Sequence, residues 1–281
     1  MKHLFLTTAE PMPKPHFVML SLIMAASTLL WSPHSQAQNS PSRIGSVTAT
    51  KPDWLSLVKH HGSEGVLQRL ESQLAELPEY ELWMHRQERL PSGWNEQAFV
   101  NYIKYRHQPR QVYMKWLPGG PKAGQEILYD ETRRKDAMYG HLAGILNVTS
   151  IWTALDGSLA RSNSMHSVRD AGLHAVVQIL RSQLESHRQQ GRMAPPVAAD
   201  NITHEREPQV ALTWVTPTDA PKHQRYAART RIVLINASPW IRQVESWDEQ
   251  GELIERVVFD KIQATRFSTV DFEANNPAYR F

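Results

Sequence analysis

The chain has 281 residues, a formal net charge of +3 and no cysteine. The lack of cysteine excludes disulfides, thiolate nucleophiles, cysteine-ligated metals and an acylated lipoprotein anchor. Lysine and arginine are scattered among the 28 acidic residues, so the sequence lacks the basic patch that is typical of nucleic-acid binding, and we expect no nucleic-acid partner.

The first residues have the pattern of an export signal. A basic start precedes an uncharged run, Phe17–Trp31, and the small-x-small triplet Ser35-Gln36-Ala37. The run is shorter than the about 20 residues that a membrane span needs. The pattern predicts a signal peptide over residues 1–37 with cleavage near Ala37, and hence a periplasmic or secreted protein without stable membrane insertion. An uncleaved anchor is the alternative.

The remaining chain divides into a leader and one domain. Residues 38–52 are polar and without periodicity, which predicts a flexible leader. Residues 53–281 suffice for a single sizeable domain. Its first predicted helix spans Ser63–Leu77, with Ser63 as the N-cap, and a shorter helix over Asp53–His61 precedes it.

The spacing of the apolar residues changes after this helix. Short segments rich in aromatic and branched side chains alternate with turn residues, which indicates an antiparallel meander. The predicted strands are Tyr80–Leu90, Gln97–His107, Arg110–Leu117, Gln125–Glu131, Ala137–Leu142 and Val148–Leu155. Within Val112–Leu117 both alternate sets of side chains contain bulky groups, so this strand is expected to line something on both faces of the sheet.

A long helix over Val168–Gln190 is predicted next, with an apolar stripe of Val176, Ile179, Leu180 and Leu184. Four more strands follow, at Gln209–Thr216, Arg229–Asn236, Trp240–Asp248 and Glu252–Arg266, with turn signals at Asn236–Pro239 and Asp248–Gly251. This order predicts an α+β domain whose strongly curved antiparallel sheet forms an incomplete barrel with helices packed on its concave face.

Catalytic motifs are missing from the sequence. It has no G-x-S-x-G elbow, no phosphate-binding glycine loop and no H-E-x-x-H pair, and its histidines are dispersed. We therefore predict no catalytic residue, no metal site and no cofactor. Lys115 and Glu126 form either a charge pair at a pocket mouth or a cross-strand surface pair worth a few tenths of a kcal/mol. The polar loop Arg161–His166 either presents Ser164 and His166 to a ligand or caps the next helix.

Three segments carry a family resemblance. VYMKWL (112–117), GQEILY (124–129) and DFEANNPAYRF (271–281) resemble the exported bacterial proteins of domain of unknown function 1571, over a region from about Leu67 to Phe281. SMHSVRDAGL (164–173) also fits, with Met165 and Arg169 in place of an arginine and a threonine. That family is similar to the periplasmic lipoprotein carrier and its outer-membrane receptor. The resemblance implies a lipoprotein-carrier-like fold around a hydrophobic cavity and supplies no catalytic residues.

These observations predict a non-catalytic periplasmic binding or carrier protein for a hydrophobic small molecule, lipid or lipidated protein. The candidate cavity-lining residues are Trp83, Tyr113, Trp116, Leu128, Tyr129, Trp152 and Trp214, and the candidate polar mouth is Lys115, Glu126 and His166. Two alternatives remain open. One is an envelope glycan- or lipid-modifying hydrolase or transferase acting through Glu126, Asp130 and His166, and the other is a structural envelope protein without a ligand.

Overall fold

A computed structural model describes residues 52–141, 149–161, 164–204, 206–217, 226–235 and 240–281. The predicted signal peptide, almost all of the leader and the turn signal at 236–239 lie outside the described residues. Described elements begin with α1 (Trp54–Ala75) and end with the short helix η4 (Thr269–Phe272). No helix in these described ranges is long and apolar enough to cross a membrane.

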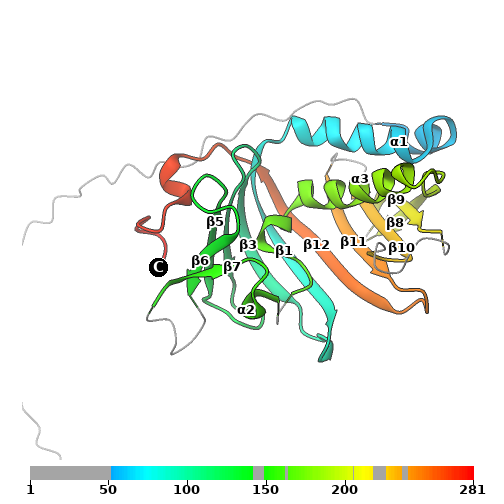
Figure 1. The fold of residues 1–281 in the computed structure, drawn as a ribbon. Coiled ribbons are helices and arrows are strands. Elements are labelled where there is room, and N and C mark those ends of the chain that lie inside the picture. Colours follow the sequence, from blue (N-terminus) through cyan, green and yellow to red (C-terminus); the bar gives the residue numbers. More distant parts are fainter. Residues whose placement is uncertain (1–51, 142–148, 162–163, 205, 218–225, 236–239) are drawn as a thin grey trace, which may run out of the picture. The chain divides into compact units, whose positions relative to one another are not determined.

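One twelve-stranded sheet organises the described part of the chain, and all of its strand pairs are antiparallel (Figure 1). The strand order is β7-β6-β5-β4-β3-β1-β12-β11-β10-β9-β8, and β2 pairs with β1 outside this path. The strands are β1 (Glu79–Leu90), β2 (Gly93–Trp94), β3 (Phe99–Arg106), β4 (Gln111–Trp116), β5 (Glu126–Asp130), β6 (Ala137–His141), β7 (Ile151–Ala154), β8 (Val197–His204), β9 (Glu207–Val215), β10 (Arg229–Ile235), β11 (Ile241–Trp247) and β12 (Leu253–Ala264).

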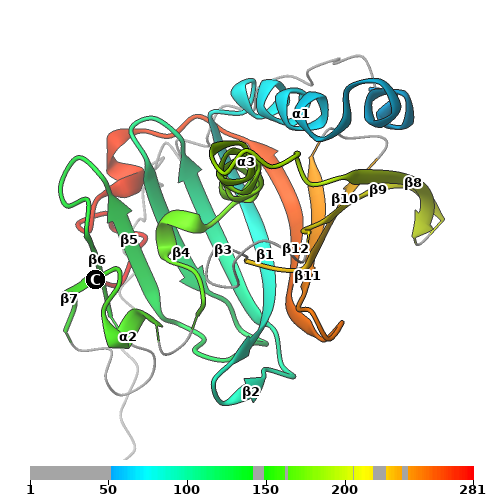
Figure 2. The same cartoon turned by 45° about the vertical axis from the view of Figure 1, so that its right-hand side comes forward.

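Two long helices cover the inner face of this sheet. The sheet curves around α3 (Leu173–Gln189), and α1 lies beside α3 and β8 (Figure 2). The predicted fold class, an open curved antiparallel sheet with helices on its concave side, is confirmed. The main hydrophobic core fills the space between these helices and the inward side chains of the strands.

Both predicted helical regions are present, with shifted boundaries. The two N-terminal helices join into α1 across a kink at Gly62, whose φ of 55° and ψ of −152° are non-helical and readily reached only by glycine. The long helix begins later than expected because Gly172, at φ 89°, interrupts it after the 3₁₀ turn η2 (Val168–Asp170). Of its predicted stripe, Leu180 and Leu184 are buried.

The last residues cover the outer face of the sheet. η4 contacts β4 and β5, and an aromatic cluster forms between the tail and the outward side chains of these strands. Its members are Tyr113, Leu128 and Phe272, with Tyr102, Tyr139, Phe267, Ala274, Tyr279 and Phe281 packed around them. The expectation that the Val112–Leu117 strand is covered on both faces is therefore met, because Val112, Met114 and Trp116 face the main core while Tyr113 faces the tail.

Candidate functional site

A cavity of about 380 Å³ lies between the inner face of β3–β7 and the segment that connects α2 (Ser158–Arg161) to α3. Large apolar side chains form much of its wall. The lining residues are Arg86, Phe99, Met114, Trp116, Lys122, Gln125, Ile127, Met138, Gly140, His141, Thr149, Ile151, Thr153, Leu155, Ala160, Ser164, His166, Ser167 and Val168. Its volume falls within the range of about 300–1,000 Å³ that is typical of small-molecule sites.

Of the seven candidate lining residues, Trp116 lies in this wall. Tyr129 and Trp214 face the same side of the sheet but are packed into the main core, where they are almost fully buried. Of the three candidates on the inner face, Trp116 therefore borders this cavity, whereas Tyr129 and Trp214 belong to the core.

The other four candidates lie on the opposite face of the sheet. Tyr113 and Leu128 are buried beneath the C-terminal tail. The Trp83 ring lies under the Lys261 ammonium, 3.4 Å from its centroid. Trp152 is 39% exposed and alternates with Ile151 and Thr153, which line the cavity. The physical reason is the two-residue period of a strand, which sends neighbouring aromatic side chains to opposite faces.

The three candidate mouth residues are divided in the same way. The ammonium of Lys115 lies 2.9 Å from the Glu126 carboxylate on the outer face, where Glu126 also accepts a hydrogen bond of 3.0 Å from the backbone N–H of Arg280. His166 lines the cavity on the inner face. The side chains of Lys115 and Glu126 therefore serve the packing of the tail and do not meet His166.

The cation that the sequence interpretation missed is Lys122, in the turn between β4 and β5. This residue lines the cavity, with its ammonium 5.7 Å from the centroid of the Phe99 ring. Burial and the nearby Arg86 lower the pKa of Lys122. Gly120 allows the turn to approach β3, because a Cβ at this position would lie 2.9 Å from the carbonyl oxygen of Ala98.

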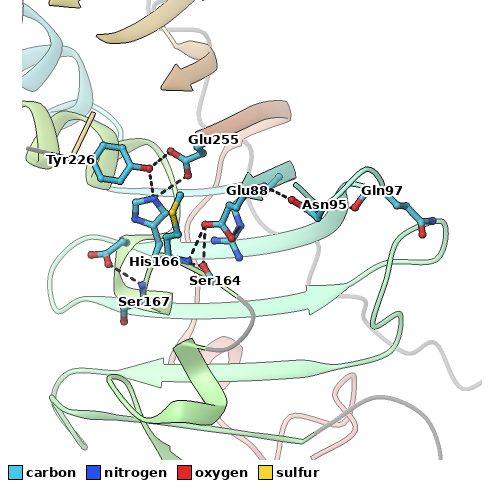
Figure 3. A network of polar contacts seen from close by, with 11 residues as sticks. Glu88, Asn95, Gln97, Ser164, His166, Ser167, Tyr226 and Glu255 are labelled. Atoms are coloured by element: carbon cyan, nitrogen blue, oxygen red, sulfur yellow. Dashed lines mark hydrogen bonds and ion pairs between the residues drawn. The ribbon is translucent and has the colours of Figure 1, made fainter. Parts of the chain in front are cut away.

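A buried polar network borders the cavity on the side of β1 and β12. Figure 3 shows the His166 ring beside Tyr226 and Glu255, and Ser164 reaching Glu88. His166 Nε2 lies 3.0 Å from Glu255 Oε1 and 2.8 Å from the Tyr226 hydroxyl. Ser164 Oγ donates a hydrogen bond of 3.2 Å to Glu88 Oε1. The network therefore ties the segment before α3 to the two central strands of the sheet.

The charges in this network balance. Burial opposes protonation of His166, but the adjacent Glu255 carboxylate outweighs this effect and raises the pKa of His166 above its ordinary value. Burial likewise opposes ionisation of Glu255, yet His166 and the Tyr226 hydroxyl lower the pKa of Glu255. Arg86, whose Nε lies 3.5 Å from Glu88 Oε2, supplies the second positive charge. Two carboxylates thus face two cations.

Glu88, His166 and Glu255 also place possible metal-ligand atoms within 4.8 Å of one another. No spacing in the sequence reveals this group, because its members come from β1, a loop and β12. The contact of Arg86 with Glu88 and that of Tyr226 with Glu255 already satisfy part of the carboxylate charge, which disfavours an added cation. The predicted absence of a metal site stays a prediction.

The arrangement offers little to the predicted catalytic alternative. Glu126 and Asp130 point to the outer face of β5, whereas His166 lies on the inner face. His166 Nε2 is engaged by both Glu255 and Tyr226, and Ser164 Oγ donates to Glu88. These bonds hold the segment in place and leave neither group poised as a base and nucleophile pair.

Comparison with known proteins gives one family and several distant structural likenesses. A family model described as "Protein of unknown function (DUF1571)" matches residues 77–281. No curated protein matches the sequence.

Similar solved structures include an uncharacterized conserved protein from Thermus thermophilus, 11% identical over 77% of this chain and 96% of that one, with a TM-score of 0.44. The MucA/MucB complex of Pseudomonas aeruginosa is 14% identical over 76% of this chain and 61% of that one, with a TM-score of 0.43. A LolA-superfamily protein from Nitrosomonas europaea is 9% identical over 76% of this chain and 98% of that one, with a TM-score of 0.33. With TM-scores below 0.5, these likenesses assign neither a ligand nor a partner.

Proposed function

The chain belongs to the DUF1571 family, and we propose that it is a non-catalytic binding or carrier protein for a hydrophobic ligand such as an acyl chain, a lipid or a lipidated peptide. The observation that carries this proposal is the cavity of about 380 Å³ whose wall includes Met114, Trp116, Ile127 and Met138. Burial of an acyl chain there would contribute about 0.8 kcal/mol for each methylene removed from water.

The proposal includes export. The basic start, the uncharged run and the Ser35-Gln36-Ala37 triplet favour a mature protein that begins at Gln38 and acts in the periplasm or outside the cell. N-terminal sequencing of the protein purified from its host checks this point. Recovery of the intact N-terminus in a detergent-dependent form would contradict it.

The binding role is tested with a neutral reporter. N-phenylnaphthylamine carries no charge and fluoresces when it enters an apolar site, so its titration measures capture by apolar surface alone. We expect saturable binding to the chain that begins at Gln38. In Trp116→Ala the affinity should fall at least tenfold, because the variant removes a large part of the cavity wall.

Trp152→Ala is the matched control, since it makes the same change on the opposite face of the sheet, where the indole is 39% exposed. Its affinity should stay within twofold of the wild type. Unfolding by urea is recorded for all three proteins to separate binding from stability. A wild type that binds no reporter would remove the carrier proposal and favour a structural role, and equal losses in the two variants would show that the cavity is not the binding site.

A further inference from the structure

Basic side chains outnumber acidic ones on the wall of the cavity itself, and the carboxylates that pair with Arg86 and His166 lie behind this wall. Arg86, Lys122 and His166 line it together with His141, whereas none of the described lining residues is an aspartate or a glutamate. Because a charge is costly to bury unless it is paired, this asymmetry points to a ligand with a negative charge.

Lys122 is the unbalanced charge. The two carboxylates of the buried network, Glu88 and Glu255, are already matched by Arg86 and His166. Within the described residues no carboxylate forms an ion pair with Lys122, and its ammonium contacts the face of the Phe99 ring. One positive charge therefore remains at the cavity when the network is complete.

The backbone of Lys122 indicates that this position is held at some cost. Its φ is 62°, in the left-handed region that residues with a side chain rarely adopt because it strains the backbone. The carbonyl of Lys122 accepts a hydrogen bond of 3.1 Å from the N–H of Gln125, and Trp116 accepts one of 2.9 Å from Gly124, so the turn is fixed on both sides. From this turn the ammonium reaches the Phe99 ring at the wall of the cavity.

Arg86 provides the second half of a head-group site. This residue is 9% exposed, and its Nε is buried without a hydrogen bond, because the separation of 3.5 Å from Glu88 exceeds a good hydrogen-bond length. Arg86 also lines the cavity, and a planar guanidinium is suited to a carboxylate or phosphate oxygen. Arg86 and Lys122 both line the cavity, so both cations are available to an anion that binds there.

We propose that the ligand is an anionic amphiphile whose carboxylate or phosphate head lies between Arg86 and Lys122 while its apolar tail lies along Met114, Trp116 and Ile127. This inference rests on the proposed function and names its ligand class. A neutral amphiphile with a tail of the same length gains the same apolar burial but leaves the Lys122 ammonium without a counter-charge. A cationic head adds a third positive charge.

The test is displacement of N-phenylnaphthylamine from the chain that begins at Gln38 by four dodecyl compounds: dodecanoic acid, dodecyl phosphate, dodecanol and dodecyltrimethylammonium. From the wild type, the better of the two anions should displace half of the reporter at a concentration at least tenfold below that needed with dodecanol. The cationic compound should be the weakest competitor. Whether the acid or the phosphate is the better competitor identifies the head group.

Lys122→Gln is the decisive variant, because it removes the charge and disturbs no ion pair. Its preference for the anion over dodecanol should fall below threefold, with each competitor compared at the reporter affinity measured for that variant. Lys261→Gln is a closely matched control: Lys261 also has a left-handed backbone, at φ 50°, and also lies over an aromatic ring, but on the outer face of the sheet. This control should keep the full preference.

Two outcomes overturn the inference in different ways. In the first, the wild type binds the reporter and releases it equally to dodecanoic acid, dodecyl phosphate and dodecanol. In that case the proposed head-group site is wrong, and the proposed binding of hydrophobic ligands is unaffected. The same holds if Lys122→Gln keeps the anion preference. If the wild type binds no reporter, the proposed function is wrong, and the proposed head-group site is wrong as a consequence.

Discussion

Lys115 and Trp116 are neighbours on β4 whose side chains serve opposite faces of one sheet. The Lys115 ammonium lies 2.9 Å from the buried carboxylate of Glu126 beneath the C-terminal tail, whereas the Trp116 indole forms part of the cavity wall. A substitution at one position should therefore act on stability through the outer face, and a substitution at the next should act on ligand capture through the inner face.

Lys115→Ala should destabilise the protein by about 1–3 kcal/mol, more than the few tenths expected for a surface pair, because Glu126 has no exposed side-chain surface and would lose its charge partner. Urea unfolding at neutral pH measures this effect. The reporter affinity should not change. The double variant Lys115→Ala/Glu126→Gln should recover part of the loss, since it removes the stranded charge, and a single variant as stable as the wild type would contradict the prediction.

Tyr279 should anchor the C-terminal tail. Its ring stacks on Tyr113 with centroids 3.9 Å apart, and its hydroxyl donates a hydrogen bond of 2.6 Å to the carbonyl of Asp271. Tyr279→Ala should cost about 2 kcal/mol of unfolding free energy, and Tyr279→Phe about 1 kcal/mol, since only the hydrogen bond is lost. Both variants should bind the reporter normally, because the stack lies on the face opposite the cavity. A Tyr279→Ala protein that melts like the wild type would show that the tail is dispensable.

His166 and Glu255 should make stability depend on pH with a maximum in mildly acid solution. The raised pKa of His166 stabilises the fold below about pH 6.5, and this contribution is lost as pH rises through the folded pKa. The lowered pKa of Glu255 stabilises the fold above about pH 4.5, and this contribution is lost as pH falls through its folded pKa. The difference in unfolding free energy between wild type and His166→Gln should thus be largest between about pH 4.5 and 6.5. A difference that grows from pH 6 to pH 9 would have the wrong sign.

His174 should lower the stability of the fold in acid solution, whereas His166 raises it. The ring is stacked with His107 at 4.3 Å and with Tyr105 at 5.3 Å, and burial followed by repulsion from His107 lowers its pKa to about 3. The unfolded chain takes up a proton there below about pH 6.5 while the folded protein does not, so stability falls as pH falls towards 3. His174→Phe, which keeps a flat ring, should reduce the loss between pH 6.5 and pH 4 by about 3 kcal/mol. Parallel pH profiles for the two proteins would contradict the assignment.

The order of helices and strands could be predicted because their side-chain periods are regular. The edge strand β8 (Val197–His204) was missed, since its polar residues, including Asp200, Asn201 and Thr203, show no alternation of apolar groups, and it pairs only with β9 at the edge of the sheet. A half-solvated edge strand needs no apolar face, so the sequence carries little signal for it.

The candidate site was less accessible to sequence reasoning. Trp116 could be placed in a wall because a strand with bulky residues on both alternate positions must be covered twice. The face of the sheet on which each aromatic side chain lies could not be assigned without knowing how the strands pair. Glu88, His166 and Glu255 come from three distant segments, and Lys122 owes its direction to a left-handed turn, so neither feature has a local signature.

The central pairing of β1 with β12 has a consequence for the order of folding. Tyr80, at the start of the sheet, pairs with Ala264, close to the end of the chain. The hairpins β3–β7 and β9–β12 can form as soon as their own residues are available, but the two halves join only after nearly all of the chain has been delivered. Closing so long a loop is an entropic cost that slows folding. Under the export proposed above, such a delay would keep the domain unfolded during translocation, and the sheet would be completed only after the chain has crossed the membrane.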